Sequence, residues 1–427
     1  MGRSPGPRTT RRQLLATAAA ATSLAGCQTS INDDSDETVT PAPVPEEEVS
    51  GETMALRYAG DDPTVAAIDQ LIANFETVHE GSDLVAAPLG DATSNSGPTV
   101  VYDRIGANLA PRGARLRDLS ELWDGERDAY PYGVTVSSFI ARSFVVLPQA
   151  VHRLNCLYYN PRVLADAGVV LEDYATVSDL RASPGALDSA VETLFAQPLR
   201  RAVELLELWE SLLAGRLYRE RQHVQYVVGD VPDNPLPIRR SLRDLDAALS
   251  MLPASAQDAT PAALLDGVVD GSVGFVRQPT WVARELVDRP DTTYGTDWAV
   301  APVFASPWTV TFVAWGFAAP GTPSRAATPR EVIDFATTPE RQRAFCVTAR
   351  ALPARTDVTV DSHPMMAEQA ADYRAASMHL PSMAHGIAVR PPVRRRLETA
   401  LSSFRQHRDV DRGVADLVAA LRTARVL

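Results

Sequence analysis

The sequence predicts an α/β protein with two lobes, and three observations support this fold class. The first apolar segment, residues 54–59, has the length and pattern of a strand and leads into a helical pattern over residues 63–79. Strand and helix patterns then alternate along the chain, as they do in α/β domains. The roughly 370 residues after position 53, in a chain with 45% hydrophobic residues, can bury more than one core.

Apolar periodicity defines the individual elements. Val65, Ile68 and Leu71 fall on one face of the first helix, and Asn160 followed by Pro161 is a helix-start signal. Short apolar runs predict strands at residues 54–59, 97–102, 144–148, 154–159, 271–276, 298–303 and 310–318. Helical spacing predicts helices at residues 63–79, 105–109, 160–166, 242–252, 261–269, 329–336, 339–345, 364–376, 394–404 and 414–421, and a helical lobe interior between residues 186 and 217.

The N-terminal segment, residues 1–27, predicts a twin-arginine lipoprotein signal. Arg11 and Arg12 precede a short apolar run that ends at Leu24-Ala25-Gly26-Cys27. The run is too short to span a membrane, and small residues before a cysteine suit a signal peptidase that leaves a lipid on Cys27. A chance arginine pair before an alanine-rich helix does not explain why the run ends at this cysteine. We therefore expect a lipid anchor on the extracellular face of the cytoplasmic membrane.

Residues 28–53 predict a disordered, acidic tether. Asp, Glu, Ser, Thr and Pro dominate this segment, which has almost nothing to bury. Twin-arginine export normally carries folded proteins, so folding before export is a further hypothesis.

The charged residues point to an acidic surface. All 41 basic residues are arginine, because the chain contains no lysine, and the formal net charge is −12. This composition excludes the basic footprint of a nucleic-acid-binding protein. Acidic, lysine-free surfaces are typical of halophiles, whereas a GC-rich genome is the alternative cause of the preference for arginine.

Two cysteines remain after lipidation, Cys156 and Cys346. One disulfide is possible, but two buried thiols are the favoured interpretation. No second apolar stretch approaches transmembrane length.

A crossover motif carries the clearest resemblance to a known family. The pattern Pro-x-x-x-His-Arg-x-Asn-x-x-x-Tyr-Asn resembles Gln149-Ala150-Val151-His152-Arg153-Leu154-Asn155-Cys156-Leu157-Tyr158-Tyr159-Asn160, and residues 164–169 match the helix that follows it. This pattern occurs in the solute-binding components of ABC importers, specifically the sugar-binding, glucose- and maltose-type group.

Other stretches resemble the same family in the same order. Residues 339–345 and 352–358 resemble its Pro-x-x-Gln-x-x-Phe and Pro-Ala-Arg-Thr-Asp-Val motifs, and residues 381–386 resemble Pro-Ser-x-x-His-Gly. Residues 97–109 align more loosely with an early strand of the family.

The resemblance implies a type II periplasmic-binding-protein-like fold, with a ligand cleft between two lobes joined by several hinge crossings. The N-terminal lobe would comprise residues 54–148 and 312–345, and the C-terminal lobe residues 149–311 and 346–427.

Motif positions also imply the ligand-binding residues. Aromatic rings would stack on sugar faces, while charged and amide side chains would bond sugar hydroxyls. The implied ligand-binding residues are Tyr58, Asp61, Tyr102, His152, Arg153, Asn155, Trp281, Arg350 and His385. Several family contacts are changed: the aspartate before Trp281 is missing, Pro98-Thr99 replaces a Pro-Asp pair, and Ala349-Arg350-Ala351 replaces Lys-Gly-Ser. Specificity for a hexose therefore stays open.

Structural roles are the alternative for many of these side chains. His152 and Arg153 would then fix the hinge, with Arg153 paired to a carboxylate. Trp281 would then belong to the core, as would Trp308 and Trp315, and His385 would be a helix-end residue. Arg355 is expected to anchor the third crossing rather than the solute.

Two possible metal sites are alternatives to this interpretation. The Tyr158-Tyr159 pair resembles a ferric-iron ligand pair, but its position matches the sugar-type crossover. The spacing of His363, His379 and His385 resembles no zinc motif. We expect no metal and no cofactor.

Together these patterns predict the receptor of an ABC importer, which captures a small polar solute such as a sugar or glycoside and delivers it to the permease subunits. The alternatives are a binding or sensor module without a transport role, and a surface glycoside hydrolase. Hydrolysis needs two acids that flank the cleft, and Asp61 and Asp62 are adjacent in sequence with no evident partner. We therefore expect no enzyme activity.

Overall fold

A computed structural model describes residues 54–89, 99–304, 308–321 and 328–425. The predicted signal, Cys27 and the predicted tether lie outside the described residues. Within the described ranges, no helix is both long enough and apolar enough to cross a membrane.

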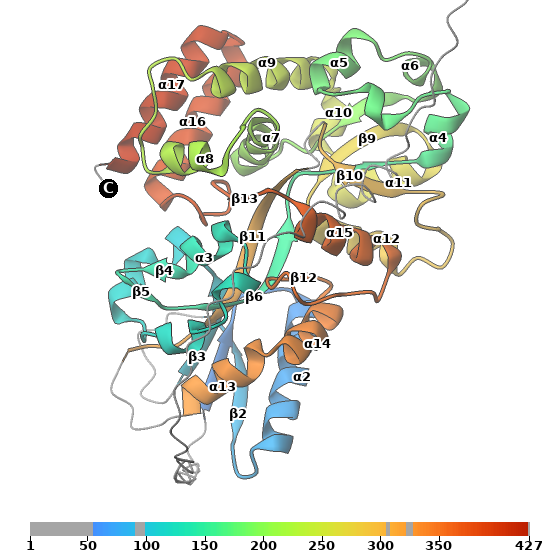
Figure 1. Cartoon of the computed structure of the whole chain (residues 1–427). Coiled ribbons are helices and arrows are strands. Elements are labelled where there is room, and N and C mark those ends of the chain that lie inside the picture. The colour runs from blue at the N-terminus through green and yellow to red at the C-terminus, as the bar shows by residue number, and fades with distance from the viewer. Residues whose placement is uncertain (1–53, 90–98, 305–307, 322–327, 426–427) are drawn as a thin grey trace, which may run out of the picture. The chain divides into compact units, whose positions relative to one another are not determined.

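The larger of two principal sheets has seven strands, in the order β12-β6-β11-β3-β1-β2, with β13 paired to β11. Strand β1 is parallel to β2 and β3, whereas β11 is antiparallel to β3 and β6. Helices α2, α13 and α14 pack beside this sheet (Figure 1). The bounds are β1 Met54–Tyr58, β2 Leu84–Pro88, β3 Thr99–Arg104, β6 Leu147–Arg153, β11 Thr309–Ala318, β12 Leu352–Pro353, β13 Met378–Pro381, α2 Asp62–Val78, α13 Thr328–Thr337 and α14 Pro339–Ala349.

The smaller sheet has four strands in the order β10-β7-β9-β8. Its strands are β7 Cys156–Tyr159, β8 Thr193–Ala196, β9 Val273–Gln278 and β10 Ala299–Pro302. The other helices are α3 Tyr132–Ser138, α4 Pro161–Asp166, α5 Val177–Ala182, α6 Leu187–Ala190, α7 Ala202–Ala214, α8 Glu220–Val227, α9 Leu236–Met251, α10 Ala254–Asp258, α11 Pro261–Asp270, α12 Arg284–Val287, α15 Pro364–Ala375, α16 Pro391–His407 and α17 Val410–Arg422. A small hairpin joins β4 Phe139–Ile140 to β5 Ser143–Phe144.

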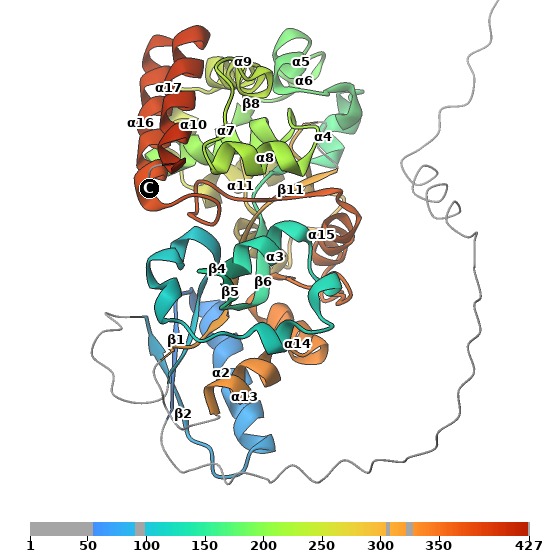
Figure 2. The same cartoon turned by 60° about the vertical axis from the view of Figure 1, so that its left-hand side comes forward.

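Two hydrophobic clusters meet at the smaller sheet, because successive residues of a strand face opposite sides. Tyr158 of β7 and Val276 of β9 belong to a cluster that continues into the larger sheet. Their neighbours Leu157 and Phe275 belong to a second cluster, which is built with α7, α9, α16 and α17. Figure 2 shows α16 and α17 side by side in this second region. The two sheets and their helices form the two-lobed α/β fold that the sequence predicts.

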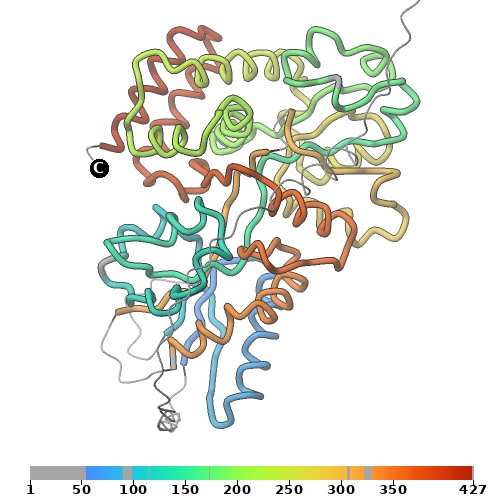
Figure 3. Tube along the Cα trace, in the orientation of Figure 1, coloured from blue at the N-terminus to red at the C-terminus, as the bar shows by residue number. Residues whose placement is uncertain are grey.

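The chain passes directly from one sheet to the other after β6. Strand β6 ends in the larger sheet at Arg153, and β7 begins in the smaller sheet at Cys156. The turn between them is tied to both sides, because Leu154 N–H donates to the Thr311 carbonyl and Val303 N–H donates to the Asn155 carbonyl. Figure 3 follows this passage along the chain.

Most predicted elements are confirmed, with local differences. Residues 193–196 form β8 rather than part of a helix, because they pair in parallel with β9. Residues 106–108 form a 3-10 turn instead of an α-helix. Strand β6 continues to Arg153, five residues beyond the predicted end at residue 148. Strand β2 and helix α3 were not predicted.

Candidate functional site

The site begins where two parallel strands of the larger sheet end. Strand β1 ends at Tyr58 and its neighbour β3 ends at Arg104, so both carboxyl ends meet at one edge. Asp61 then caps α2 by accepting a hydrogen bond from Thr64 N–H. Ligands in α/β proteins commonly bind at the carboxyl ends of strands.

Strands β6 and β11 add two rings to the same edge. Trp315 lies directly opposite Arg104 in the antiparallel β11–β3 pair, and directly opposed side chains share a face of the sheet. The imidazole of His152 on β6 contacts the Trp315 ring edge to face, with centroids 5.4 Å apart. Both side chains are half-buried.

Two further rings come from segments that follow β9 and β13. Trp281 lies in a 3-10 turn after β9, and its ring centroid is 5.6 Å from that of His152. His385 follows β13, with its ring centroid 5.4 Å from that of Trp281. We call His152, Trp281, Trp315 and His385 the ring cluster. All its ring contacts are edge to face.

A buried ion pair holds the His385 imidazole. His385 Nε2 lies 2.9 Å from Glu207 Oε1, and Arg277 donates to Glu207 Oε2 at 2.8 Å. Burial by itself raises the pKa of Glu207, but the hydrogen bond from His385 and the charge of Arg277 lower it to about 2. Arg277 also donates to Ser211 and to the Leu154 carbonyl. The Glu207 carboxylate is therefore anionic at neutral pH and fixes the orientation of His385.

His152 differs from His385 in its charge environment. Burial lowers the pKa of His152 to about 4, although the charge of Asp61 opposes the shift. Its Nδ1 lies 3.4 Å from Thr280 Oγ1. His152 is therefore neutral at physiological pH.

Two predicted ligand residues, Asp61 and Arg350, form ion pairs with the α12 segment. Asp61 pairs with Arg284, whereas Arg350 pairs with Asp288 at 2.6 Å. Burial raises the pKa of Asp61, but its bonds with Arg284 and Thr64 bring the net pKa below its usual value. Arg350 caps the C-terminus of α14 in the left-handed conformation, with φ of 52°, and its ion pair is with Asp288 rather than with a member of the ring cluster.

Arg153 and Asn155 belong to a second cluster, which we call the crossing cluster: Arg153, Asn155, Gln369 and Asp372. Arg153 donates to the side chains of all three other members and to the Thr309 carbonyl. Asn155 bonds Thr309 and Thr311 of β11. Both residues are 0% exposed. Their ligand-binding assignment is therefore wrong for this conformation, and the hinge-fixing alternative fits because the side chains of Arg153 and Asn155 are hydrogen-bonded within the protein.

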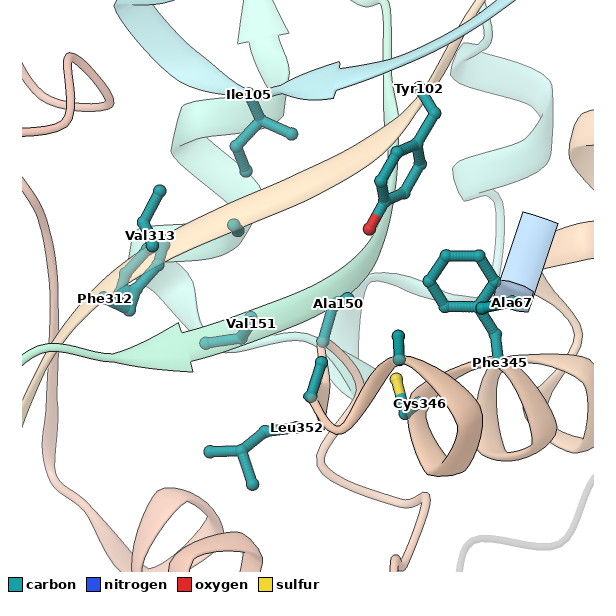
Figure 4. Close-up of a cluster of buried hydrophobic side chains, with 14 of the residues drawn as sticks. Ala67, Tyr102, Ile105, Ala150, Val151, Phe312, Val313, Phe345, Cys346 and Leu352 are labelled. Atoms are coloured by element: carbon teal, nitrogen blue, oxygen red, sulfur yellow. The ribbon is translucent and has the colours of Figure 1, made fainter. Parts of the chain in front are cut away.

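Tyr102 is also misplaced among the ligand residues. It is 2% exposed, and its ring packs against Phe317 and Phe345. Figure 4 shows Tyr102 and Phe345 among the buried side chains of the larger sheet. Burial raises its pKa well above the usual value. Tyr58, one strand away, is half-buried at the strand edge and stays compatible with the site.

The structure also tests the roles predicted for the two cysteines, for Trp308 and for Arg355. Cys156 and Cys346 are buried, free thiols. Trp308 is 60% exposed and is therefore not a core residue. Arg355 pairs with Asp357 and Glu126, as expected for an anchor of the third crossing.

The residues of the two possible metal sites contact different groups of the protein. Tyr158 is buried and donates to the Pro279 carbonyl. His363 caps α15, His379 contacts the Tyr373 carbonyl, and His385 contacts Glu207. Among the described residues, no group of three or more His, Cys, Asp or Glu side chains could hold a metal ion.

Sequence reasoning missed several residues of the site. Glu207 and His385 lie 178 positions apart, and Arg284 and Asp61 lie 223 apart, so no local motif joins them. Arg104 could have been noticed, because it ends a predicted strand next to the first strand, whose end carries Tyr58. The arrangement offers aromatic surfaces and hydrogen-bond donors, which are groups suited to binding a polar solute.

Comparisons with known proteins identify relatives of this chain. The chain is 24% identical over 392 residues to the xylose/arabinose-binding protein XacG of Haloferax volcanii, covering 85% of this chain and 83% of that protein. It is 22% identical over 330 residues to an uncharacterized ABC transporter extracellular-binding protein of Pyrococcus horikoshii, covering 72% of this chain and 70% of that protein. No protein-family model matches the sequence.

Solved structures share the fold. RafE from Streptococcus pneumoniae superposes with a TM-score of 0.69 at 12% identity, over 88% of this chain and 99% of that chain. A chitin oligosaccharide binding protein gives a TM-score of 0.67 at 16% identity, with the same coverage. The two relatives and the chitin oligosaccharide neighbour are named as binding proteins. The chain is thus a relative of the extracellular solute-binding proteins of ABC transporters and has their two-lobed fold.

Proposed function

We propose that this relative of the ABC-transporter receptors captures a sugar or glycoside and delivers it to the permease subunits of an importer. The ring cluster carries the proposal, because it gathers two tryptophans and two histidines from β6, β11 and the segments after β9 and β13. Indole rings pack on the apolar faces of sugars, while imidazole and indole N–H groups bond hydroxyls. The sugar-binding names of the relatives support the same class of ligand.

Capture would proceed by closure of two lobes, which we place at residues 54–148 with 312–345 and at 149–311 with 346–427. Strands β6 and β11 run through the first two boundaries, and β12 follows the third. The contact of Asp61 with Arg284 would form as the lobes close. A closed, liganded conformation is what an importer can distinguish from the free receptor.

Location is the second part of the proposal. A twin-arginine signal would export the folded chain, a lipid on Cys27 would hold it at the outer face of the membrane, and residues 28–53 would link the anchor to the receptor. The acidic, lysine-free composition supports a protein that works in high salt. Labelling with a radioactive lipid precursor in the source cell tests the anchor, and Cys27→Ser should abolish the label and release the protein.

A thermal-shift screen tests the ligand class. The chain from residue 54 onward, in high salt, is mixed with pentoses, hexoses, disaccharides, glycosides and sugar acids. A ligand that binds only the folded state raises the melting temperature. The proposal expects a concentration-dependent rise with at least one carbohydrate. If no carbohydrate raises the melting temperature while an amino acid, peptide or metal does, the sugar proposal is wrong.

A further inference from the structure

The charged side chains around the ring cluster differ in whether an oppositely charged side chain pairs with them. Asp61 is neutralised by Arg284, Asp103 by Arg112, and Glu207 by Arg277 together with His385. A fourth carboxylate, Glu210, is buried and accepts hydrogen bonds from Ser382 and from the Met383 and Ala384 N–H groups. A sugar hydroxyl that donates a hydrogen bond would find few free acceptors there.

Arg104 is the exception on the positive side. No carboxylate of the described residues lies within ion-pair distance of its guanidinium, although arginine–carboxylate pairs are common elsewhere in the described ranges. Its Nη1 donates to the His385 carbonyl at 3.4 Å, which places it beside a member of the ring cluster. The side chain is half-buried, so water compensates it less than it would a surface arginine.

The register of the sheet gives Arg104 its direction. Arg104 is opposite Trp315 in the β3–β11 pair, so the two side chains lie on the same face of the sheet. His152 contacts the Trp315 ring from the adjacent strand β6. An arginine thus stands at the end of a row of aromatic rings.

The neighbouring groups are donors as well. Neither the Trp281 nor the Trp315 indole N–H has a protein acceptor within the described residues, and neutral His152 retains one ring N–H. His385 contacts the Glu207 carboxylate through its Nε2. A guanidinium, ring N–H groups and an anion-backed imidazole match a ligand rich in acceptors.

We propose, on the basis of the receptor function above, that the ligand is an acidic sugar, with its carboxylate bound by Arg104 and its ring packed in the ring cluster. A bidentate guanidinium–carboxylate contact is among the stronger protein hydrogen-bonding arrangements. The carboxylate of an acidic sugar also supplies the anionic partner that Arg104 lacks, so its binding neutralises a half-buried charge. A neutral sugar leaves that charge unpaired.

Matched pairs of sugars test this proposal by isothermal titration calorimetry. Glucuronate is compared with glucose, and galacturonate with galactose, using the chain from residue 54 onward at about 0.2 M and about 2 M salt. We expect at least one acid to bind about tenfold or more tightly than its neutral partner. The preference should shrink but persist at high salt, because the contact is half-buried.

Three variants separate a direct contact from a general charge effect. Arg104→Gln should reduce the preference for the acid to about one while leaving the binding of the neutral sugar within about threefold. Arg104→Lys should restore part of the preference. Arg115→Gln removes an exposed arginine of the same region and should leave both affinities unchanged.

The outcomes distinguish this inference from the receptor proposal. If neutral sugars bind as tightly as or more tightly than their acids, the acidic-sugar inference is wrong and the sugar receptor stands. If the acids are preferred but Arg104→Gln keeps the preference, the assignment of Arg104 is wrong. If neither acid binds, the acidic-sugar inference is wrong, and the wider thermal-shift screen decides the receptor proposal separately.

Discussion

Two neighbouring residues of β6, His152 and Arg153, belong to clusters with opposite properties. Arg153 is fully buried, and its guanidinium is surrounded by the other members of the crossing cluster. His152 is half-buried, and its ring contacts Trp281 and Trp315. One dipeptide therefore supplies a structural tie and a site residue, because successive residues of a strand face opposite sides.

The two clusters differ in how their polar groups are satisfied. In the crossing cluster, protein partners take up the donors of Arg153, so nothing is left for a solute. In and beside the ring cluster, the indole N–H groups have no acceptor among the described residues, and the Arg104 guanidinium has only the His385 carbonyl and no carboxylate partner there. A position in a binding-protein motif is therefore not enough to assign a ligand contact. The free hydrogen-bonding capacity of the side chain decides the assignment.

The largest expected effect is the loss of the Arg153 guanidinium. Arg153→Met removes the fully buried cation that pairs with Asp372 and donates to Gln369, and we expect the free energy of unfolding to fall by about 3–5 kcal/mol. Denaturant unfolding in high salt measures this change. The control Arg162→Met removes an arginine that is 64% exposed and paired with Asp297, and should cost less than about 1 kcal/mol. Similar losses in both variants would remove the distinction between the crossing cluster and the surface.

The charge of Glu207, which pairs with Arg277 behind the ring cluster, should contribute about 3 kcal/mol to the free energy of unfolding, and this contribution should depend on pH. The pKa of Glu207 is lowered from its usual value near 4.5 to about 2, so its stabilisation is complete above the usual value. This contribution is lost as the pH falls through the folded pKa. Glu207→Gln should therefore be less stable than the wild type at pH 6, with a gap that narrows toward pH 3.

Unfolding free energies of both proteins between pH 6 and pH 3 test the Glu207 prediction. A constant gap across this range would show that the carboxylate charge is not the source of the stabilisation. The wild type and Glu207→Gln are measured at every pH, because other carboxylates titrate in the same range in both proteins.

The smallest effect is expected for the ion pair between the strand edge and α12. Asp61 and Arg284 are 46% and 35% exposed, so solvent screens their attraction. Asp61→Asn should change the unfolding free energy by less than about 1 kcal/mol, and the change should vanish at high salt. A loss of solute affinity above about tenfold would instead return Asp61 to the ligand contacts that the sequence predicted.

The fold was largely predictable because apolar periodicity is a local signal. The first strand, the helix that begins near Pro63, and the long strand ending at Ala318 have patterns that tertiary contacts do not override. Residues 193–196 were misassigned because their apolar spacing resembled a helix, whereas pairing with β9 makes them a strand. That pairing partner lies about 80 residues away in the sequence, beyond any local window.

The site was only partly predictable, because side-chain partners are long-range. The motifs located His152, Trp281 and His385, which the structure brings together. The same motifs also marked Tyr102, whose burial depends on Phe317 and Phe345 from other elements. Sequence spacing cannot distinguish an accessible residue at the end of a strand from a buried residue two positions earlier, because both side chains face the same side of the sheet.

The most direct test of the ring cluster as the binding site is the ligand-induced shift in melting temperature of Trp281→Ala. With a carbohydrate that stabilises the wild type, the account predicts that Trp281→Ala loses most of the shift while its unliganded melting temperature changes little. Trp308→Ala, in which the removed ring is 60% exposed, should keep the full shift. An unchanged shift in Trp281→Ala would contradict the account, because the solute would then bind away from the rings.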